Sequence, residues 1–176
     1  MQDRSVATSN LDEPIELASY DPSWPTAGAS AIAELTALLA DLKPTIEHIG
    51  STAIVGMTAK PVIDLMLDIE RPGDIDEVVK RLNRLGWQDL GEAGVPGRRY
   101  LRRRNGLPAN LHIIRKASDL WIDNLCLRDF LRSHPEETGE YGAPKLKLVR
   151  QGHRSLLAYS TAKAVYMRGL IDKARH

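Results

Sequence analysis

The most regular alternation of hydrophobic and polar residues lies in the middle of the chain, between Val62 and Ile69. Side chains two positions apart share one face of a β-strand, so this run predicts a strand with two unlike faces. Its apolar face is formed by Ile63, Leu65, Leu67 and Ile69. Its other face carries Asp64 and Asp68, and an unpaired carboxylate is costly to bury. We therefore expect the apolar face to pack beneath helices and the acidic face to look toward an opening.

The remaining periodic segments predict a fold of the α/β (α+β) class. Strands are expected at 45–49, 62–69, 99–104 and 109–115, with short strands at 15–19 and 87–90. Helices are expected at 24–42 and 74–85. A helical C-terminal half is expected to begin at Ser118, to break near 133–135 and 152, and to end in a long helix near 173. Together these elements predict a mixed, mostly antiparallel sheet with flanking helices.

Residue types that favour helix ends and turns mark several of these boundaries. Ser23 and Asp74 are candidate N-caps, because their side chains can accept hydrogen bonds from the first turn of a helix. Pro44 and Gly86 are expected to end the two helices. The dipeptide Asn105-Gly106 predicts the tight turn of a hairpin, which would make the strands on its two sides neighbours.

Length and composition indicate one globular domain. In the chain of 176 residues, the polar segment 1–13 is expected to be a flexible tail and 14–176 a single domain. Lys and Arg number 24 and Asp and Glu 23, so the net charge of +1 creates no field that would attract nucleic acid. The chain has neither a signal-peptide pattern nor an apolar run long enough to cross a bilayer. We expect a cytoplasmic protein without a membrane partner.

The segment before the acidic strand contains a candidate phosphate site. Gly50-Ser51 follows the strand that ends at Ile49, and a loop leads from there to Asp64. This loop can return backbone N–H groups and the Ser51 hydroxyl to the side of the carboxylate. N–H groups and hydroxyls suit phosphate oxygens, and a carboxylate suits a divalent cation. A Gly-Ser dipeptide alone indicates no more than a turn, but its combination with Asp64 points to nucleotide or phosphate chemistry.

Five arginines form the densest charge cluster of the chain. They are Arg98, Arg99, Arg102, Arg103 and Arg104. Strand alternation divides even-numbered from odd-numbered members between two faces, unless a bulge shifts the register. Guanidinium groups on one face can bind phosphate, whereas a solvated row of them can protect an edge strand from aggregation. RNA binding is less favoured, because Tyr100 alone supplies an interleaved aromatic ring.

Short motifs from about Ile15 to the C-terminus recur in a distinctive order. They are 20–25 (YDPSWP), 47–52 (EHIGST), 60–64 (KPVID), 94–100 (GVPGRRY), 111–113 (LHI), 127–132 (LRDFLR), 134–136 (HPE), Tyr159 and Lys163. On these residues the chain resembles the GrpB family of the nucleotidyltransferase-like superfamily. The superfamily signature is a hydrophobic residue, Gly-Ser, a spacer and an Asp on a strand.

The resemblance implies a nucleotidyltransferase-like fold that binds a nucleoside triphosphate or another phosphorylated small molecule. The catalytic residues would be Asp64, Lys60 and His112, and Asp64 would hold Mg²⁺ or Mn²⁺. The nucleotide- or phosphate-binding residues would be Gly50, Ser51, Thr52, Arg98, Arg99, Arg128 and Lys163. The acceptor of a transferred nucleotidyl group and the base preference are not identified by these motifs.

The chain departs from the superfamily at the second acid, which active members carry two residues after the first. Met66 occupies that position, and His112 occupies the position expected for a third acid. Asp68 lies roughly 13 Å along the strand from Asp64, too far to share one ion without a bulge. A single-metal site and a site without metal are therefore alternatives to a two-metal site. The alternatives to a nucleotidyltransferase are a non-catalytic module that binds a nucleotide or small anion, and a protein-interaction domain.

Overall fold

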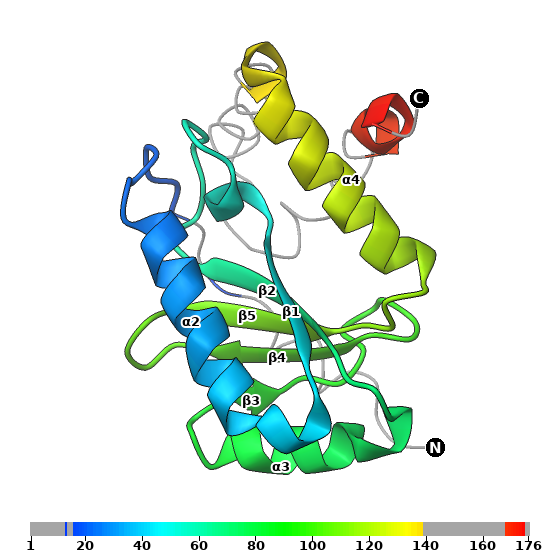
Figure 1. Ribbon diagram of the computed structural model, residues 1–176. Coiled ribbons are helices and arrows are strands. Elements are labelled where there is room, and N and C mark those ends of the chain that lie inside the picture. The colour runs from blue at the N-terminus through cyan, green and yellow to red at the C-terminus, as the bar shows by residue number, and fades with distance from the viewer. Residues whose placement is uncertain (1–12, 14–15, 139–167, 175–176) are drawn as a thin grey trace.

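The computed structural model describes residues 13, 16–138 and 168–174, with a five-stranded sheet at its centre (Figure 1). The strands are β1 (Thr45–Ile49), β2 (Ile63–Asp68), β3 (Gln88–Asp89), β4 (Arg99–Arg103) and β5 (Ala109–Ile113). Their order across the sheet is β1-β2-β5-β4-β3. The pair β2 and β5 is parallel, and the other three pairs in this sheet are antiparallel. The predicted mixed, mostly antiparallel sheet is confirmed.

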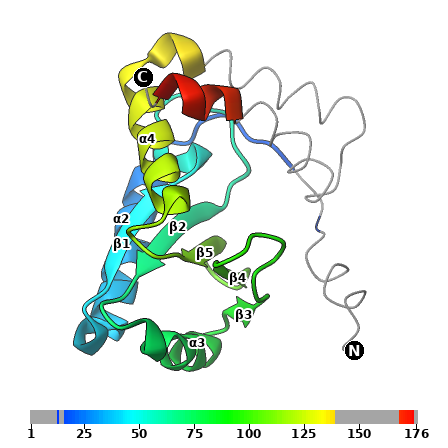
Figure 2. The ribbon, with the colours of Figure 1, turned by 90° about the vertical axis from the view of Figure 1, so that its right-hand side faces the viewer.

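Two helices, α2 (Trp24–Leu38) and α3 (Ile75–Asn83), cover one face of the sheet. A 3₁₀ turn, η1 (Ala40–Leu42), follows α2, and another, η3 (Pro72–Asp74), precedes α3. The main core lies between these helices and the odd-numbered side chains of β2, β4 and β5, among them Leu65 of β2 and Leu111 of β5. Figure 2 shows α2 along one side of the sheet and α3 below it. The apolar face of β2 is therefore buried, as the alternation predicts.

A glycine allows α2 to approach β1 closely. A Cβ atom on Gly28 would lie 2.3 Å from His48 Nδ1, so no larger residue fits against the imidazole ring. His48 is 8% exposed, and its Nε2 lies 2.9 Å from Thr52 Oγ1 in η2 (Ser51–Ala53). Burial lowers the pKa of His48 to about 4, which keeps the ring neutral at pH 7. His48 is thus a packing residue between α2, β1 and η2.

The hairpin of β4 and β5 has a longer loop than the predicted two-residue turn. The pairing runs regularly from Arg99 with Ile113 to Arg103 with Ala109, so 104–108 connect the strands. Pro108 has no N–H group to donate across the hairpin, which explains why the pairing stops there. The prediction of a tight two-residue turn at Asn105-Gly106 is therefore wrong. The regular register also excludes a bulge within β4.

Several predicted boundaries differ in detail. The strand expected at 15–19 is a single bridge between Ala18 and Ala59 within the described residues. Helix α2 ends at Leu38, before the predicted end at Leu42. Neither Ser23 nor Asp74 makes a side-chain cap hydrogen bond. These differences do not change the order of the elements.

Helix α4 (Asp119–Ser133) packs against the opposite face of the sheet near β1 and β2. Its N-cap is Ser118, whose hydroxyl accepts a hydrogen bond from the Trp121 N–H at 3.3 Å. The helix ends before Pro135, as predicted. A further helical segment at 168–174 places Leu170 against Leu127 of α4. The predicted break at 152 and most of the final helix lie outside the described residues. Among the helices that the structure describes, none combines the length and apolar character needed to cross a membrane.

Candidate functional site

Asp64 lies on the sheet face that α2 and α3 leave uncovered, and Gly50 touches it. Gly50 follows β1 with φ of 72° and ψ of −169°, a combination that is accessible to glycine and strained for other residues. A Cβ atom on Gly50 would lie 2.8 Å from Asp64 Oδ2 and 3.1 Å from Asp64 Cβ. The turn can therefore contact the carboxylate only because residue 50 has no side chain. Ser51, at the start of η2, is half-buried beside this contact.

Strand β5 places two polar side chains beside Asp64. Asn110 is the direct partner of Asp64 in the parallel register, and its Nδ2 donates to Asp64 Oδ1 at 2.7 Å. His112 Nε2 lies 3.8 Å from the same oxygen. Burial would raise the pKa of Asp64, but the nearby His112 imidazole, the hydrogen bond from the Asn110 amide and the charge of Lys60 lower it to about 2. With 30% of its side chain exposed, Asp64 is an accessible anion at neutral pH.

Asn110 connects Asp64 to the next strand. Its Oδ1 accepts hydrogen bonds from the Tyr100 hydroxyl at 3.0 Å and from Arg104 Nη2 at 2.9 Å. These two donors orient the amide so that its NH₂ group points to Asp64. Burial raises the pKa of Tyr100 to about 12, and the charge of Asp64 acts in the same direction, so the hydroxyl keeps its proton. The amide is thus held in one orientation from both sides.

Lys60 and Arg104 both bind the carboxylate of Glu13. Lys60 Nζ donates to Glu13 Oε1 at 2.8 Å. Arg104 Nη2 and Nε donate to the two oxygens of the same carboxylate at 2.6 and 2.9 Å. Burial would raise the pKa of Glu13, but the hydrogen bonds from Arg104 and Lys60, together with their charges, lower it to about 2. A cationic group therefore lies on the far side of Asn110 from Asp64.

Arg98 joins the site from its other rim. Its Nη1 lies 3.4 Å from His112 Nδ1, and its guanidinium carbon lies 4.9 Å from the centre of the Tyr100 ring. Its Nη2 donates to the carbonyls of Glu92 and Ala93 at 3.1 and 3.0 Å, which ties the preceding glycine-rich loop to the sheet face. Burial lowers the pKa of this guanidinium. Arg98 therefore lies beside His112 and Tyr100, on the same sheet face as Asp64.

The structure does not bring three other predicted residues to Asp64. Arg99 lies on the helix-covered face and pairs with Asp89 through Nε at 2.8 Å. Thr52 is 1% exposed and faces His48. Arg128 holds α4 on β1, where its Nη1 donates to Glu47 at 2.8 Å and to the backbone carbonyl of His48 at 3.2 Å. Lys163 lies outside the described residues.

The acids of β2 do not make a two-metal centre. Met66, in the second-acid position, is 0% exposed and packs in a cluster with Ile49 and Trp121. Asp68 is bound by Arg115 at 2.7 Å and by a backbone amide at 3.0 Å, far along the strand from the site. In the described part of the chain, no three His, Cys, Asp or Glu side chains group as metal ligands. Among these residues, Asp64 can offer its carboxylate to one cation, and ligand oxygens and water could complete the shell of that cation.

Some members of the site were not predicted. Asn110 is two residues before His112 and therefore on its face, so strand alternation could have identified it. The same alternation places Arg104 on the face of Arg98. Glu13 carries no signal in the sequence, because its partners are far away along the chain and only the tertiary fold brings them together.

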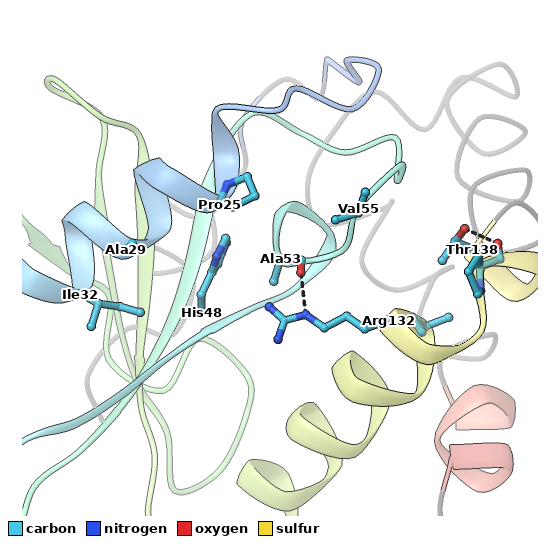
Figure 3. Close-up of a pocket in the computed structure, with 10 residues that line it drawn as sticks. Pro25, Ala29, Ile32, His48, Ala53, Val55, Arg132 and Thr138 are labelled. Carbon is cyan, nitrogen blue, oxygen red and sulfur yellow. Dashed lines mark hydrogen bonds between the residues drawn. The ribbon is translucent and has the colours of Figure 1, made fainter.

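A separate hollow lies between α2, η2 and the C-terminal end of α4 (Figure 3). Its volume is about 510 Å³. Its lining consists of Pro25, Ala29, Ile32, His48, Ala53, Val55, Leu131, Arg132, Pro135 and Thr138. Arg132 is fixed at this hollow because its Nε donates to the Ala53 carbonyl at 2.9 Å. Of the predicted site residues that the structure describes, none lines it, and Asp64 is not among its walls.

Comparison with known proteins finds relatives along most of the chain. Residues 14–173 match the family model described as "GrpB protein". The crystal structure of conserved protein GrpB from Enterococcus faecalis has a TM-score of 0.81 and 28% identity, over 90% of this chain and 96% of that chain. A UPF0157 protein of Halalkalibacterium halodurans is 26% identical over 99% of this chain and 97% of its own length. The UPF0157 protein YqkA of Bacillus subtilis is 26% identical over 92% of this chain. The chain spans about half (47%) of the length of that relative.

A more distant likeness is to terminal uridylyl transferase 4 from Trypanosoma brucei with bound CTP. It has a TM-score of 0.44 and 12% identity, over 84% of this chain and 45% of that chain.

Proposed function

The chain belongs to the GrpB family, and on that premise we propose that the sheet face opposite α2 and α3, around Asp64, binds a nucleotide or another phosphorylated small molecule. The observation that carries the proposal is the contact between Gly50 and the ionised Asp64. It puts backbone N–H groups and an anionic oxygen within reach of one ligand. Lys60 and Arg98 add positive charge near that point.

Each group would have a separate part in binding. The Gly50-Ser51 turn would hold a phosphate through its N–H groups and the Ser51 hydroxyl. Lys60 and Arg98 would neutralise the phosphate charge, and His112 would donate to a ligand oxygen beside Asp64. Lys163 remains a predicted member of this group.

We further propose that one divalent cation, Mg²⁺ or Mn²⁺, binds to Asp64 together with the ligand. Mg²⁺ often takes one or two carboxylates and completes its shell with phosphate oxygens and water. His112 Nε2 lies 3.8 Å from Asp64 Oδ1 and would stay a hydrogen-bond donor to the ligand, because Arg98 donates toward its other ring nitrogen, Nδ1. The cation would supply positive charge at the phosphate.

Nucleotidyl transfer is the catalytic form of this proposal, and a binding module without catalysis is the second candidate. Met66 favours the second candidate, because its side chain is fully buried where active transferases need another acid. Pyrophosphate release from a bound triphosphate would distinguish the two. An interaction domain, in contrast, predicts no response to any of these ligands.

The test is thermal unfolding of the wild type and of Asp64→Asn with a panel of nucleoside triphosphates, with and without Mg²⁺ or Mn²⁺. A ligand at about 100 times its dissociation constant should stabilise the wild type by roughly 2.7 kcal/mol, or about 5–10 °C. Asp64→Asn keeps an oxygen for the Asn110 amide but loses the charge, so the metal-dependent part of the shift should disappear.

Asp68→Asn is the matched control, since it removes a carboxylate from the same strand and face outside the site. It should keep the ligand response of the wild type. A response that survives in Asp64→Asn would refute the role of Asp64, and no response of the folded wild type to any triphosphate would refute nucleotide binding.

A further inference from the structure

Three cationic side chains surround the single carboxylate of Glu13. Lys60 and Arg104 bind it directly, at 2.8 Å and at 2.6 and 2.9 Å. Arg102 Nη1 lies 3.7 Å from the same carboxylate. The side chains of Glu13 and Lys60 are each 19% exposed, and that of Arg102 is 15% exposed. Around Glu13 the described contacts thus leave two positive charges in excess of the negative one.

Two of the three cations, Arg102 and Arg104, are held in place by groups other than Glu13. Arg104 donates to the carbonyls of Arg103 and Ala109 at 3.0 and 3.1 Å, and to Asn110 at 2.9 Å. Arg102 Nε donates to Gln88 at 3.0 Å across the β3–β4 pair. Because sheet contacts fix both guanidinium groups, they would stay close together without Glu13. The arrangement is a preformed anion site rather than a pair that Glu13 creates.

This cluster of Lys60, Arg102 and Arg104, here called the cationic trio, adjoins the site proposed above. Arg102, Asn110 and Asp64 are consecutive partners across β4, β5 and β2, and therefore lie in one row on one face of the sheet. One side chain, Asn110, separates the trio from Asp64, with its two ends bonded to Arg104 and Asp64. A ligand with phosphates at Asp64 is thus within one side chain of the trio.

We infer that the cationic trio is a second anion subsite, that Glu13 occupies it in the unliganded protein, and that a dianionic phosphate group of the ligand displaces Glu13. A carboxylate neutralises one of the three positive charges, whereas a phosphate dianion neutralises two and offers three oxygens to the same donors. The inference rests on the proposed function, and it names the ligand class as a molecule with a terminal phosphate or polyphosphate. Glu13 then lowers the apparent affinity by competing for the trio.

The probe for this inference is inorganic pyrophosphate, titrated calorimetrically into the full chain in metal-free buffer at constant ionic strength. Glu13→Gln removes the competing charge and should bind pyrophosphate at least about 10-fold more tightly than the wild type, if Glu13 occupies the trio for about nine-tenths of the time or more. The double variant, with both Glu13→Gln and Arg104→Gln, should bind pyrophosphate at least about 10-fold more weakly than Glu13→Gln alone.

Glu34→Gln is the matched control. It removes one carboxylate charge, as Glu13→Gln does, but beside Arg103 of β4. Glu34 pairs with Arg103 at 2.7 Å on the helix-covered face. It should leave the affinity for pyrophosphate within about twofold of the wild type, which separates displacement of Glu13 from a general change in net charge.

Equal or weaker binding by Glu13→Gln would overturn the inference and make Glu13 a permanent structural partner of the trio. An equal gain in Glu34→Gln would overturn it as well. If the Glu13→Gln protein does not fold, the double variant gives no affinity either. The single variant Arg104→Gln is then compared with the wild type, and an unchanged affinity for pyrophosphate would overturn the subsite. Failure of the proposed function looks different, because pyrophosphate would bind while no nucleoside triphosphate shifts the unfolding of the wild type.

Discussion

Individual residues at the site matter as much for the atoms they lack as for those they carry. Gly50 lets the turn after β1 reach Asp64, and Gly28 lets α2 reach His48. In both places a neighbouring side chain fills the space where a Cβ atom would be. The chemistry of the Asp64 site therefore depends on a backbone position with no functional group of its own.

Replacing Gly50 by Ala tests this dependence. The backbone there is strained for any other residue, and the added Cβ would overlap the Asp64 carboxylate, so Gly50→Ala should lower the free energy of unfolding by about 2–4 kcal/mol. It should also remove any ligand-induced thermal shift. Chemical denaturation and the triphosphate panel measure the two effects.

Gly56→Ala provides the control, because Gly56 also has a positive φ, of 78°, but no atom within 4 Å of the position of a Cβ. It should lower stability by about 1–2 kcal/mol through the backbone alone and keep the ligand response. Similar losses of ligand response in both variants would show that the contact with Asp64 is unimportant.

At the scale of elements, α4 decides which part of β2 can act as a site. Trp121 of α4 covers Met66, while Asp64, two residues earlier on the same face, stays partly exposed. Arg128 secures this helix on β1 through Glu47. An acid at position 66 would therefore be buried under a helix instead of facing a ligand.

Met66→Asp should consequently not create a second metal ligand. A carboxylate at a position that is 0% exposed has no described partner there, so the variant should lose at least about 3 kcal/mol of unfolding free energy. Met66→Leu keeps the volume and should lose less than about 1.5 kcal/mol. Denaturant unfolding with and without Mn²⁺ measures both; a Met66→Asp protein that is stable and gains an Mn²⁺ site would contradict this account of α4.

For the whole molecule, the neutral His48 between α2, β1 and η2 links stability to pH. Burial lowers the pKa of His48 to about 4. The charges of Arg132 and Arg128 also lower this pKa, whereas the charge of Asp64 raises it. The unfolded chain, with an ordinary histidine pKa near 6.5, takes up the proton first as the pH falls. The stabilisation is therefore complete above about pH 6.5 and is lost progressively as the pH falls toward 4.

We expect the wild-type free energy of unfolding to fall by about 2 kcal/mol from pH 7 to pH 5 through this residue. His48→Gln, which can still bond to Thr52, should lose most of that pH dependence even though it is less stable at pH 7. Urea denaturation at several pH values compares the slopes, and equal slopes in the two proteins would contradict a buried, neutral His48. Below about pH 4.5 the carboxylates of Glu13 and Asp64 should add a further loss, because the pKa of each is lowered to about 2.

The sequence by itself determined most of the elements and one contact of the candidate site. Alternation along β2 predicted its two faces, and the motif at Gly50 with Asp64 predicted a contact that the fold makes. The proximity of His112 to Asp64, implied by the family resemblance, is also found. The first two features follow from periodicity and from residue types at a fixed spacing, which are local properties of a chain, whereas the third came from the resemblance alone.

Only the tertiary structure decided which charged groups meet and which acids are buried. Hairpin register sent Arg99 to Asp89 on the covered face and left Arg104 to bind Glu13 and Asn110. The docking of α4 buried Met66. A side-chain pair between distant segments depends on strand order, register and helix docking together. No local pattern contains these, so the long-range ion pairs at the candidate site appear only once the chain is folded.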